Sequence, residues 1–296
     1  MSLPSFSIVI PTYNRPQALV ACLESFKQLA YPAELWELIV VNDGGDESFT
    51  AVTPALKQAL PLKLVDSAHG GPAKARNLGA SHAKNEFLAF TDDDCQIFPD
   101  WLNQFVTGFE QSQCDALGGR SVTPFDQNIA ERAWQHLTDF LYDFMQDERG
   151  NALLLISNNV AYKRHVFETI GGFNETFPLA AAEDMEMSFR LLKHGFKQQY
   201  YPPAKVWHYH HLTIWGHLKQ QFRYGRGGFY FNQLRQTYAE DALMALYFRR
   251  WFYNELKKSY RQKNLPISSE LVSRSAQYAY RFGVQYQSLR HRFSHE

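Results

Sequence analysis

Short, mostly apolar runs alternate with stretches of helical periodicity along the first 125 residues of the chain. In the first helical stretch, apolar side chains recur every three or four positions, at Leu19, Cys22, Leu23 and Phe26. The apolar runs lack the polar alternation of a half-exposed strand, so they predict strands that are buried on both faces. Such strands, separated by helices, indicate an α/β fold with a parallel sheet covered by helices. The predicted strands are residues 6–10, 38–41, 62–65 and 86–91.

Helix boundaries can be read from local signals. Asn14 is expected to cap the first helix, with Pro16 in its first turn. The segment GGP at 70–72 is expected to open a helix that runs to residue 83. The later part of the chain, from residue 126 on, also predicts both helices and strands. A helical, aromatic segment is expected over 126–156 and a further helix over 183–194. Strands are expected at 158–163, 196–201 and 205–208. The chain beyond 212 is expected to be helical, aromatic and basic, with a break at 266–269.

Composition narrows the class of protein. The chain has 296 residues with 45% hydrophobic composition, and 30 Lys and Arg balance 30 Asp and Glu. The zero net charge gives no global field for binding nucleic acid. Cys22, Cys95 and Cys114 are too few and too scattered for a disulfide framework or a zinc site, which favours a reducing, cytoplasmic setting. We expect no signal peptide at the N-terminus and no membrane-spanning segment.

Three adjacent aspartates, Asp92, Asp93 and Asp94, follow the apolar run FLAF of the fourth predicted strand. Ligands of parallel α/β sheets bind outside the carboxyl ends of the strands, so these side chains are expected at the functional edge. In an extended segment Asp92 and Asp94 would face one way and Asp93 the other. Paired carboxylates suit a hard divalent cation such as Mg²⁺ or Mn²⁺. A solvated acidic turn is the structural alternative.

Seven stretches together resemble the family 2 glycosyltransferases, which have the GT-A fold. They occur in the family's order between residues 6 and 211. They are IVIPTYNRP (8–16), VVNDGG (40–45), GGPAKARNLG (70–79), FLAFTDDDC (87–95), IGGFNETF (170–177), AAEDMEMSFRLLKHGF (181–196) and PPAKVWHYHH (202–211). The resemblance implies a GT-A (Rossmann-like), mostly parallel sheet in a catalytic domain over 1–211, with a helical extension over 212–296. It also implies nucleotide-sugar binding by about 1–125 and acceptor binding and catalysis by about 126–211.

The resemblance also implies a donor site for a nucleoside diphosphate sugar. Tyr13 would offer its ring to the base, Asp43 would accept hydrogen bonds from the base or ribose, and Arg76 would contact the base or an aspartate at the edge. Tyr13 could instead be an ordinary strand-end aromatic, and Asp43 an ordinary turn residue before two glycines. The expected donor-binding residues are Pro11, Tyr13, Arg15, Asp43, Lys74, Arg76, Asp92 and Asp93. For Lys74 and Arg15, the alternative is a surface charge on a helix.

The same resemblance implies a metal site and a catalytic base. Asp94 and His208 would bind Mn²⁺ or Mg²⁺, although His210 and His211 lie close enough in sequence to leave the choice of histidine open. Asp184 would act as the general base of an inverting transfer. Its position at a helix start, beside Glu183, also has a structural explanation in the helix dipole. Glu183, Gly172 and Phe173 are expected on the acceptor side.

The C-terminal part departs from the family pattern. QQFRY at 220–224 resembles imperfectly the Gln-x-x-Arg-Trp element of processive polysaccharide synthases, with Tyr in place of Trp. Residues 247–263 are basic and aromatic, which suits either an anionic membrane surface or a helix docked on the catalytic domain. Peripheral association with the inner face of a membrane is therefore one expectation.

The sequence thus predicts an inverting, metal-dependent glycosyltransferase, with UDP as the favoured donor nucleotide. The expected acceptors are glycans, lipid-linked glycans or small molecules, in polysaccharide or cell-envelope synthesis; no nucleic acid is expected. Two alternatives stay open at this stage. One is a nucleotide-binding GT-A-like subunit without transfer activity. The other is a sugar-1-phosphate nucleotidyltransferase, for which PTYNRPQ is a poor triphosphate loop. The oligomeric state is not predicted.

Overall fold

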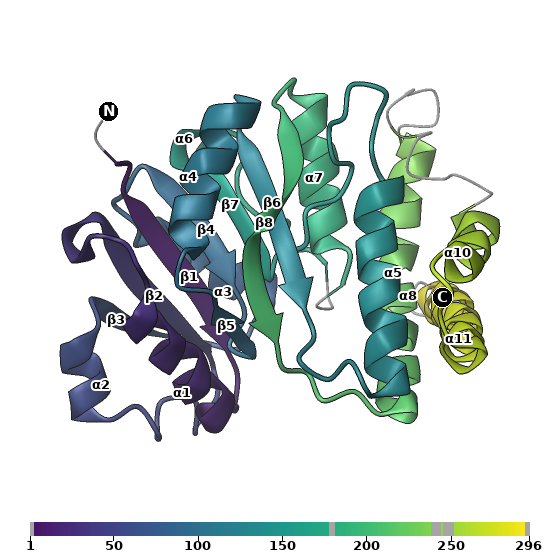
Figure 1. Cartoon of the computed structure of the whole chain (residues 1–296), viewed down its shortest axis with the longest axis horizontal. Coiled ribbons are helices and arrows are strands. Elements are labelled where there is room, and N and C mark those ends of the chain that lie inside the picture. The colour runs from purple at the N-terminus through teal and green to yellow at the C-terminus, as the bar shows by residue number, and fades with distance from the viewer. Residues whose placement is uncertain (1–2, 178–180, 238–243, 245–251, 294–296) are drawn as a thin grey trace. The chain divides into compact units, whose positions relative to one another are not determined.

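The computed structural model describes residues 3–177, 181–237, 244 and 252–293. In these residues the strands form one eight-stranded sheet with the order β3-β2-β1-β4-β7-β6-β8-β5 (Figure 1). The strands β1 to β4 run parallel, while β7 is antiparallel to both β4 and β6. The mostly parallel α/β sheet with flanking helices is confirmed. The strands are β1 (Phe6–Thr12), β2 (Trp36–Asp43), β3 (Leu62–Ser67), β4 (Phe87–Thr91), β5 (Cys95–Ile97), β6 (Ala116–Val122), β7 (Asn159–Lys163) and β8 (Gln198–His208).

Both faces of the sheet are covered because successive side chains of a strand point to opposite sides. On β2, Leu38 and Val40 join a core cluster with α1 (Pro16–Ser25), α2 (Pro54–Ala59) and α4 (Trp101–Ser112). Ile39 and Val41 point the other way and pack against Ala75 of α3 (Pro72–Ser81). These central strand residues are fully buried, which explains why their sequence is apolar at every position.

The chain divides into two compact units, and each is described by itself. The first consists of Met1–Val122, Leu155–Glu175 and Arg190–Tyr209 and contains the whole sheet. The second consists of Thr123–Leu154, Thr176–Phe189 and His210–Glu296. The end of the first unit at Tyr209 lies close to the expected domain boundary at 211. Two segments that we expected in the catalytic domain, 123–154 and 176–189, instead belong to the unit of the C-terminal helices.

The second unit is helical, as expected for the extension. α5 begins after Asn128, whose side chain caps it by accepting hydrogen bonds from the backbone N–H groups of Ala130 and Glu131. α11 packs on α8, and Gly225 and Gly283 allow the close approach: a Cβ on Gly225 would lie 1.9 Å from the Tyr280 carbonyl oxygen. The helices are α5 (Ile129–Phe144), α8 (Ile214–Thr237), α10 (Phe252–Gln262) and α11 (Ile267–Phe293), with most of α7 (Glu183–Lys193).

For the basic, aromatic segment 247–263 we left two alternatives open, a membrane surface and a docked helix, and its described residues form a docked helix. Its first five residues lie outside the described residues. In the remainder, Leu256 and Tyr260 of α10 are buried against Phe140, with Phe252 packed beside them. The aromatic face of α10 therefore packs on α5. The residues 220–224 lie inside α8, and the expected break at 266–269 coincides with the start of α11 at Ile267.

Several local expectations were wrong or incomplete, including the helical segment expected over 126–156, in which the helix α5 ends at Phe144. Asn14 does not cap α1; it adopts a positive φ of 50°, and its side chain accepts a hydrogen bond from the Glu47 N–H instead. The two strands expected at 196–201 and 205–208 are the single strand β8. The helices α2 and α4, the short helix Arg164–Thr169, and the strands β5 and β6 were not predicted. Among the described residues, no helix is long and apolar enough to span a membrane.

Candidate functional site

The carboxyl ends of three neighbouring strands, β2, β1 and β4, carry the polar residues that the sequence singled out. After β4 the chain does not continue as an extended strand but turns, and the Cys95 N–H donates to the Asp92 carbonyl oxygen at 3.0 Å. The turn buries Asp93 completely and leaves the side chains of Asp92 and Asp94 24% and 15% exposed. The three carboxylates consequently have three different environments, each with its own partners.

Asp93 is the structural member of the three. Its carboxylate accepts a hydrogen bond from the Thr12 hydroxyl at 2.7 Å and forms an ion pair with Arg15. Burial and the negative charges of Asp94 and Asp92 raise its pKa to about 7, although Arg15 and Thr12 act in the opposite direction. Asp93 thus ties β1 to the turn after β4.

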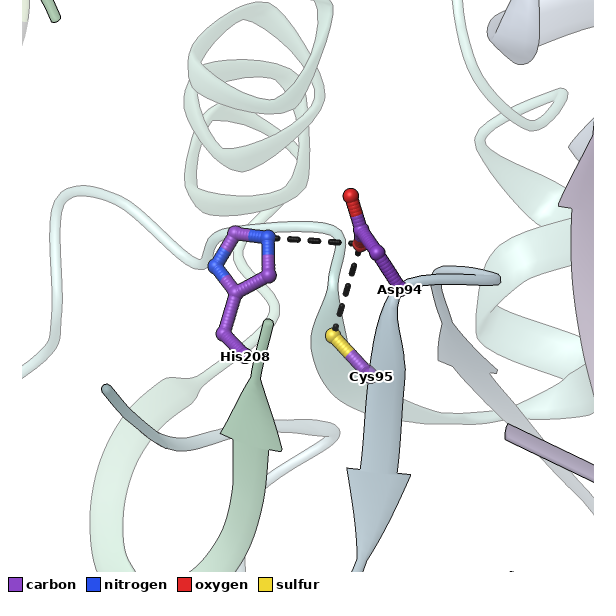
Figure 2. A group of neighbouring side chains, drawn as sticks. All are labelled: Asp94, Cys95 and His208. Carbon is purple, nitrogen blue, oxygen red and sulfur yellow. Dashed lines mark hydrogen bonds and ion pairs between the residues drawn. The ribbon is translucent and has the colours of Figure 1, made fainter. Parts of the chain in front are cut away.

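Asp94 lies between Arg15 and His208, a cationic and a potentially cationic group, and Figure 2 shows its contact with His208. Arg15 donates to its Oδ2 at 2.7 Å, and the Nε2 of His208 lies 3.3 Å from its Oδ1. Burial alone would raise its pKa, but His208 and Arg15 hold the pKa of Asp94 below its ordinary value. Conversely, burial works against the Arg15 charge, but Asp94 and Asp93 raise the pKa of Arg15 above its ordinary value. The lowered pKa favours the ionised form of the Asp94 carboxylate.

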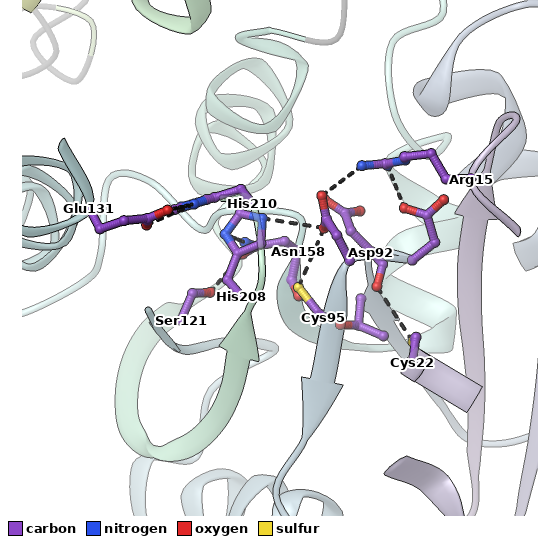
Figure 3. Close-up of polar contacts among 12 residues, drawn as sticks. Arg15, Cys22, Asp92, Cys95, Ser121, Glu131, Asn158, His208 and His210 are labelled. Atoms are coloured by element: carbon purple, nitrogen blue, oxygen red, sulfur yellow. Dashed lines mark hydrogen bonds and ion pairs between the residues drawn. The ribbon is translucent and has the colours of Figure 1, made fainter. Parts of the chain in front are cut away.

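A hydrogen-bonded chain of buried side chains positions His208 at the end of β8 (Figure 3). Ser121 donates to the amide oxygen of Asn158 at 2.9 Å, and the Asn158 amide nitrogen lies 3.3 Å from the His208 Nδ1. Since the ring is held through Nδ1, its Nε2 faces Asp94. Hydrogen-bond partners of this kind fix the orientation of a histidine that binds a metal.

Asp94, Cys95 and His208 form a group whose potential ligand atoms all lie within 4.8 Å of one another. The donor set fits a divalent cation through one carboxylate and one imidazole, a combination that suits Mn²⁺. Cys95 is a poorer candidate, because burial and the charges of Asp94 and Asp92 raise the pKa of its thiol well above the ordinary value. Only the deprotonated thiolate would bind the metal.

Arg76 on α3 holds the remaining aspartate. It is only 3% exposed, and its guanidinium lies 2.8 Å from Asp92 and over the ring of Phe173 at 5.6 Å from the centroid. Phe173 is itself 2% exposed and packs against Phe90, so its visible contribution is to support Arg76. Gly172 has a φ of 70°, and a Cβ there would lie 2.5 Å from the Asn77 side chain, which binds the Phe173 backbone.

At the end of β2, Asp43 organises the turn that precedes α3. Its carboxylate accepts hydrogen bonds from the backbone N–H groups of Gly70 and Gly71 at 2.7 and 2.9 Å, and His69 Nδ1 lies 3.0 Å away. The exposed ring of Tyr13 packs beside His69, with centroids 4.7 Å apart. Pro11 is buried within β1, and Lys74 is exposed on the first turn of α3. The two rings and Asp43 form a surface suited to a flat heterocycle.

Asp184 and Glu183 are in the first turn of α7, in the second compact unit. Glu183 is 4% exposed, whereas Asp184 is half-buried and its carboxylate accepts a hydrogen bond from the Met185 N–H at 2.8 Å. The segment that leads into α7 includes Ala182, which has a positive φ of 69°. These acidic side chains are therefore held at a helix start, where the dipole favours their negative charge.

The structure separates the three histidines of HYHH. His208 contacts Asp94. His210 pairs with the buried Glu131 at 2.9 Å, and the hydrogen bonds from His210, the Leu212 N–H and Thr123 lower the pKa of Glu131 despite its burial. The His211 ring packs at a tilt against Phe125, with centroids 4.4 Å apart, beside a cavity of about 500 Å³ in the second unit.

Several residues of the site were missed by the sequence analysis: Thr12, His69, Ser121 and Asn158. Thr12 lies inside the recognised motif at 8–16 and His69 directly precedes the one at 70–79, so their position was a usable signal. The pair Asn158 and Asn159, two amides at the start of an apolar strand, was also visible in the sequence. Nothing in it, however, indicates that Asn158 would reach His208.

Comparison with known proteins is consistent with this geometry. The profile described as "Glycosyl transferase family 2" matches residues 7–171. The O-antigen chain rhamnosyltransferase WbaN of Salmonella anatum is 30% identical over 71% of this chain and 68% of its own length. Glycosyltransferase AglE of Haloferax volcanii is 26% identical over 76% of this chain and 73% of its own. The mannosyltransferase PcManGT of Pyrobaculum calidifontis, solved with GDP-Man and Mn²⁺, has a TM-score of 0.64 at 16% identity, covering 97% of this chain and 85% of that one.

Proposed function

The chain belongs to glycosyltransferase family 2, and from this premise we propose that it moves a sugar from a nucleoside diphosphate sugar to an acceptor hydroxyl with inversion at the anomeric carbon. One observation on this chain itself supports the proposal. At the edge of the sheet where β1, β2 and β4 end, the three adjacent aspartates 92–94 form ion pairs with Arg15, Arg76 and His208. A nucleoside diphosphate and a cation together present the charges that these groups would recognise.

The donor would bind along this edge of the sheet. Tyr13 and His69 offer rings to the base, and Asp43 offers carboxylate oxygens for its hydrogen-bond donors or for the ribose. Arg15, Lys74 and Arg76 supply positive charge toward the diphosphate. Asp92 and Asp93 keep the two arginines in place. UDP is our favoured donor nucleotide, and because PcManGT was solved with GDP-Man, GDP belongs in the first screen.

Asp94 and His208 would hold the divalent cation, Mn²⁺ or Mg²⁺. When bound, the cation stabilises the negative charge that develops on the diphosphate leaving group. Binding requires Asp94 to exchange its contact with Arg15 for the metal. Arg15 is half-exposed, and its second ion pair, with the buried Asp93, would keep it at the site when Asp94 binds the cation.

Asp184 is the proposed general base. Its carboxylate accepts the proton of the acceptor hydroxyl while the hydroxyl oxygen forms a bond to the anomeric carbon. The bond between that carbon and the diphosphate oxygen breaks, the electron pair leaves with the nucleoside diphosphate, and the configuration is inverted. Glu183, Gly172 and Phe173 remain the proposed acceptor-side residues; because Glu183 and Phe173 are almost fully buried, they would shape that side rather than carry charge to it.

The acceptor is proposed to be a glycan or lipid-linked glycan in polysaccharide or cell-envelope synthesis. WbaN, an O-antigen chain rhamnosyltransferase, supports this choice. The three cysteines are buried and unpaired, which fits a reducing compartment and a cytoplasmic location. A sugar-1-phosphate nucleotidyltransferase has no support from the family.

The proposal is tested by a thermal-shift screen of UDP, GDP and dTDP with Mn²⁺, with Mg²⁺ and with chelator. One nucleotide is expected to raise Tm more with metal than with chelator. Ligand at about 100 times Kd contributes roughly 2.7 kcal/mol, a shift of several degrees for a chain of this size. Equal stabilisation in metal and chelator would remove the metal from the mechanism, and no stabilisation by any nucleotide would overturn the donor site.

A second measurement distinguishes a transferase from the remaining alternative, a binding subunit without transfer activity. The matching nucleotide sugar is incubated with the protein and metal, and release of the nucleoside diphosphate is followed with and without candidate acceptors. A transferase is expected to release it faster with the correct acceptor. A subunit that only binds the donor would show the thermal shift and no release.

A further inference from the structure

The last helix of the chain exposes an apolar stripe along its whole length. Seven large apolar or aromatic side chains of α11 are between 39% and 76% exposed, in a helix that spans about 40 Å. A scattered exposed Leu or Phe is ordinary on a protein surface, but seven on one helix are not. They are Ile267, Leu271, Tyr278, Phe282, Tyr286, Leu289 and Phe293.

These residues lie on one face. Their separations are multiples or combinations of three and four residues, which return to the same side of a helix. The opposite side is already used: Val272, Ala276 and Gly283 are buried, and a Cβ on Gly283 would lie 2.1 Å from the Phe222 carbonyl oxygen of α8. The helix therefore has one face packed in the protein and a second apolar face that is largely exposed, in which the rings of Phe282 and Tyr286 also contact Phe222 of α8.

The charge around the stripe indicates what would cover it. Residues 252–293 contain eight Lys and Arg against two Asp and Glu, whereas the whole chain is neutral. Arg274 and Arg292 are exposed and lie three residues after Leu271 and Leu289, so they flank the stripe on the same helix. Exposed aromatic and aliphatic side chains bordered by arginines are the pattern of a helix that lies in the surface of an anionic bilayer.

We propose that the exposed stripe of α11 binds the surface of an anionic phospholipid bilayer, with the helix parallel to the membrane plane. A second copy of the chain would also cover apolar side chains, but it would bring two surfaces of the same positive sign together, which opposes pairing. The bilayer supplies both the apolar layer and the opposite charge. This surface replaces the segment 247–263 as the membrane-facing part, since the described part of that segment packs α10 on α5.

The inference does not depend on the proposed transfer reaction, and its test uses no donor or acceptor. The full chain is sedimented with vesicles of phosphatidylglycerol and phosphatidylcholine, and with vesicles of phosphatidylcholine alone. We expect binding to the anionic vesicles that weakens with added salt. A double variant, Tyr278→Gln with Leu289→Gln, is expected to lower the partition coefficient at least about tenfold, because it removes two apolar side chains from the lipid boundary.

Both positions are more than half exposed, at 66% and 53%, so the variant is expected to fold, and its melting curve checks this. Leu3→Gln, an exposed apolar residue of the first unit, is the matched control and should bind vesicles as the wild type does. Arg274→Gln with Arg292→Gln should weaken binding to anionic vesicles and reduce its salt dependence.

Three results would overturn the proposal. The wild type could stay in the supernatant with anionic vesicles, or the Tyr278→Gln/Leu289→Gln variant could sediment as well as the wild type. In the third, light scattering would show a wild-type dimer that this variant converts to a monomer, with no vesicle binding by either. That result would assign the stripe to an interface between copies of the chain.

Discussion

Single residues with the same chemistry differ here in function because their surroundings differ. Asp92, Asp93 and Asp94 are adjacent, yet one is held by Arg76, one is buried on Thr12, and one is shared by Arg15 and His208. The buried one has a raised pKa, whereas the pKa of Asp94 is lowered. The ionised, partly exposed Asp94 is therefore the member best suited to meet a cation.

The first prediction distinguishes a base from a ligand. Asp184→Asn is expected to leave metal-dependent nucleotide binding nearly unchanged but to lower transfer by on the order of 10² to 10⁴, since the amide cannot accept the acceptor proton. Asp94→Asn is expected to weaken nucleotide binding in the presence of Mn²⁺ as well as turnover. Calorimetric binding and an assay of nucleoside diphosphate release measure the two effects. If Asp184→Asn loses nucleotide binding as severely as Asp94→Asn, Asp184 belongs to the donor site.

The second prediction concerns Asn158, which positions His208. Asn158→Leu has similar volume and removes the amide that meets the His208 Nδ1, so Mn²⁺ affinity should fall by about 10- to 100-fold. Ser121→Ala acts one hydrogen bond further away and should have a smaller effect. Titration with Mn²⁺ alone, followed by electron paramagnetic resonance, measures this without a donor. Wild-type affinity in Asn158→Leu would show that the ring needs no such support.

At this scale the sequence predicted residues that lie in recognisable motifs and missed those that act across the sheet. Asp43, Arg76 and Asp94 were expected at the edge and are found there. Asn158 could not be assigned a role, because it meets His208 only through the pairing of β7 and β8 with β6. That juxtaposition depends on strand order, which local pattern does not contain.

Among the elements, the central strands β1, β2 and β4 are buried on both faces, as predicted, whereas the edge strand β3 was also expected to be buried on both faces but is partly exposed. β6, with the sequence ALGGRSV, was missed because two glycines and an arginine hide its pattern. β8 was expected as two strands because Pro202 and Pro203 interrupt it. The strand continues because its pairing with β6 shifts register between Gly118 and Arg120, and prolines are tolerated where the hydrogen-bond ladder is already broken.

The third prediction tests the pairing of α8 with α11. Gly225→Ala would place a Cβ 1.9 Å from the Tyr280 carbonyl oxygen, which is backbone and cannot turn aside, so the helices must separate. Overpacking of this kind typically costs about 1–3 kcal/mol. Gly216→Ala is the same change in the same helix, where the nearest atom is the Thr213 hydroxyl at 3.2 Å, and it should be neutral or slightly stabilising. Urea unfolding compares the two, and equal stabilities would show that α8 and α11 are not held this closely.

For the molecule as a whole, charge balance conceals an uneven distribution. The chain has 30 Lys and Arg and 30 Asp and Glu, but with eight cationic and two acidic residues in 252–293, the rest retains 22 cationic and 28 acidic. The net charge of the whole chain could exclude a protein whose surface carries mainly one sign of charge. It could not indicate a basic C-terminal surface, because summing over the chain averages that surface with the acidic remainder.

The whole molecule should also lose stability in mild acid, and this is the fourth prediction. His217 on α8 is fully buried, and burial lowers its pKa to about 4. His136 on α5 is 5% exposed and lies 2.8 Å from the Ser259 hydroxyl, and burial lowers its pKa to about 4 as well. The folded state therefore binds a proton less readily than the unfolded chain, where histidine titrates near its ordinary 6.5. The stabilisation is fully present above pH 6.5 and is lost as the pH falls from 6.5 toward 4.

Between pH 7 and pH 5 each of these histidines should cost about 2 kcal/mol of the free energy of unfolding. Urea unfolding at the two pH values measures the loss, and His217→Gln should recover one histidine's share of it even if the variant is less stable at pH 7. His165, exposed on α6 (Arg164–Thr169), serves as the control, and His165→Gln should leave the wild-type difference in place. If the wild-type protein is equally stable at pH 7 and pH 5, His217 and His136 can take up a proton without disturbing α5 and α8. The two side chains would then be less enclosed in solution than the packing of these helices implies.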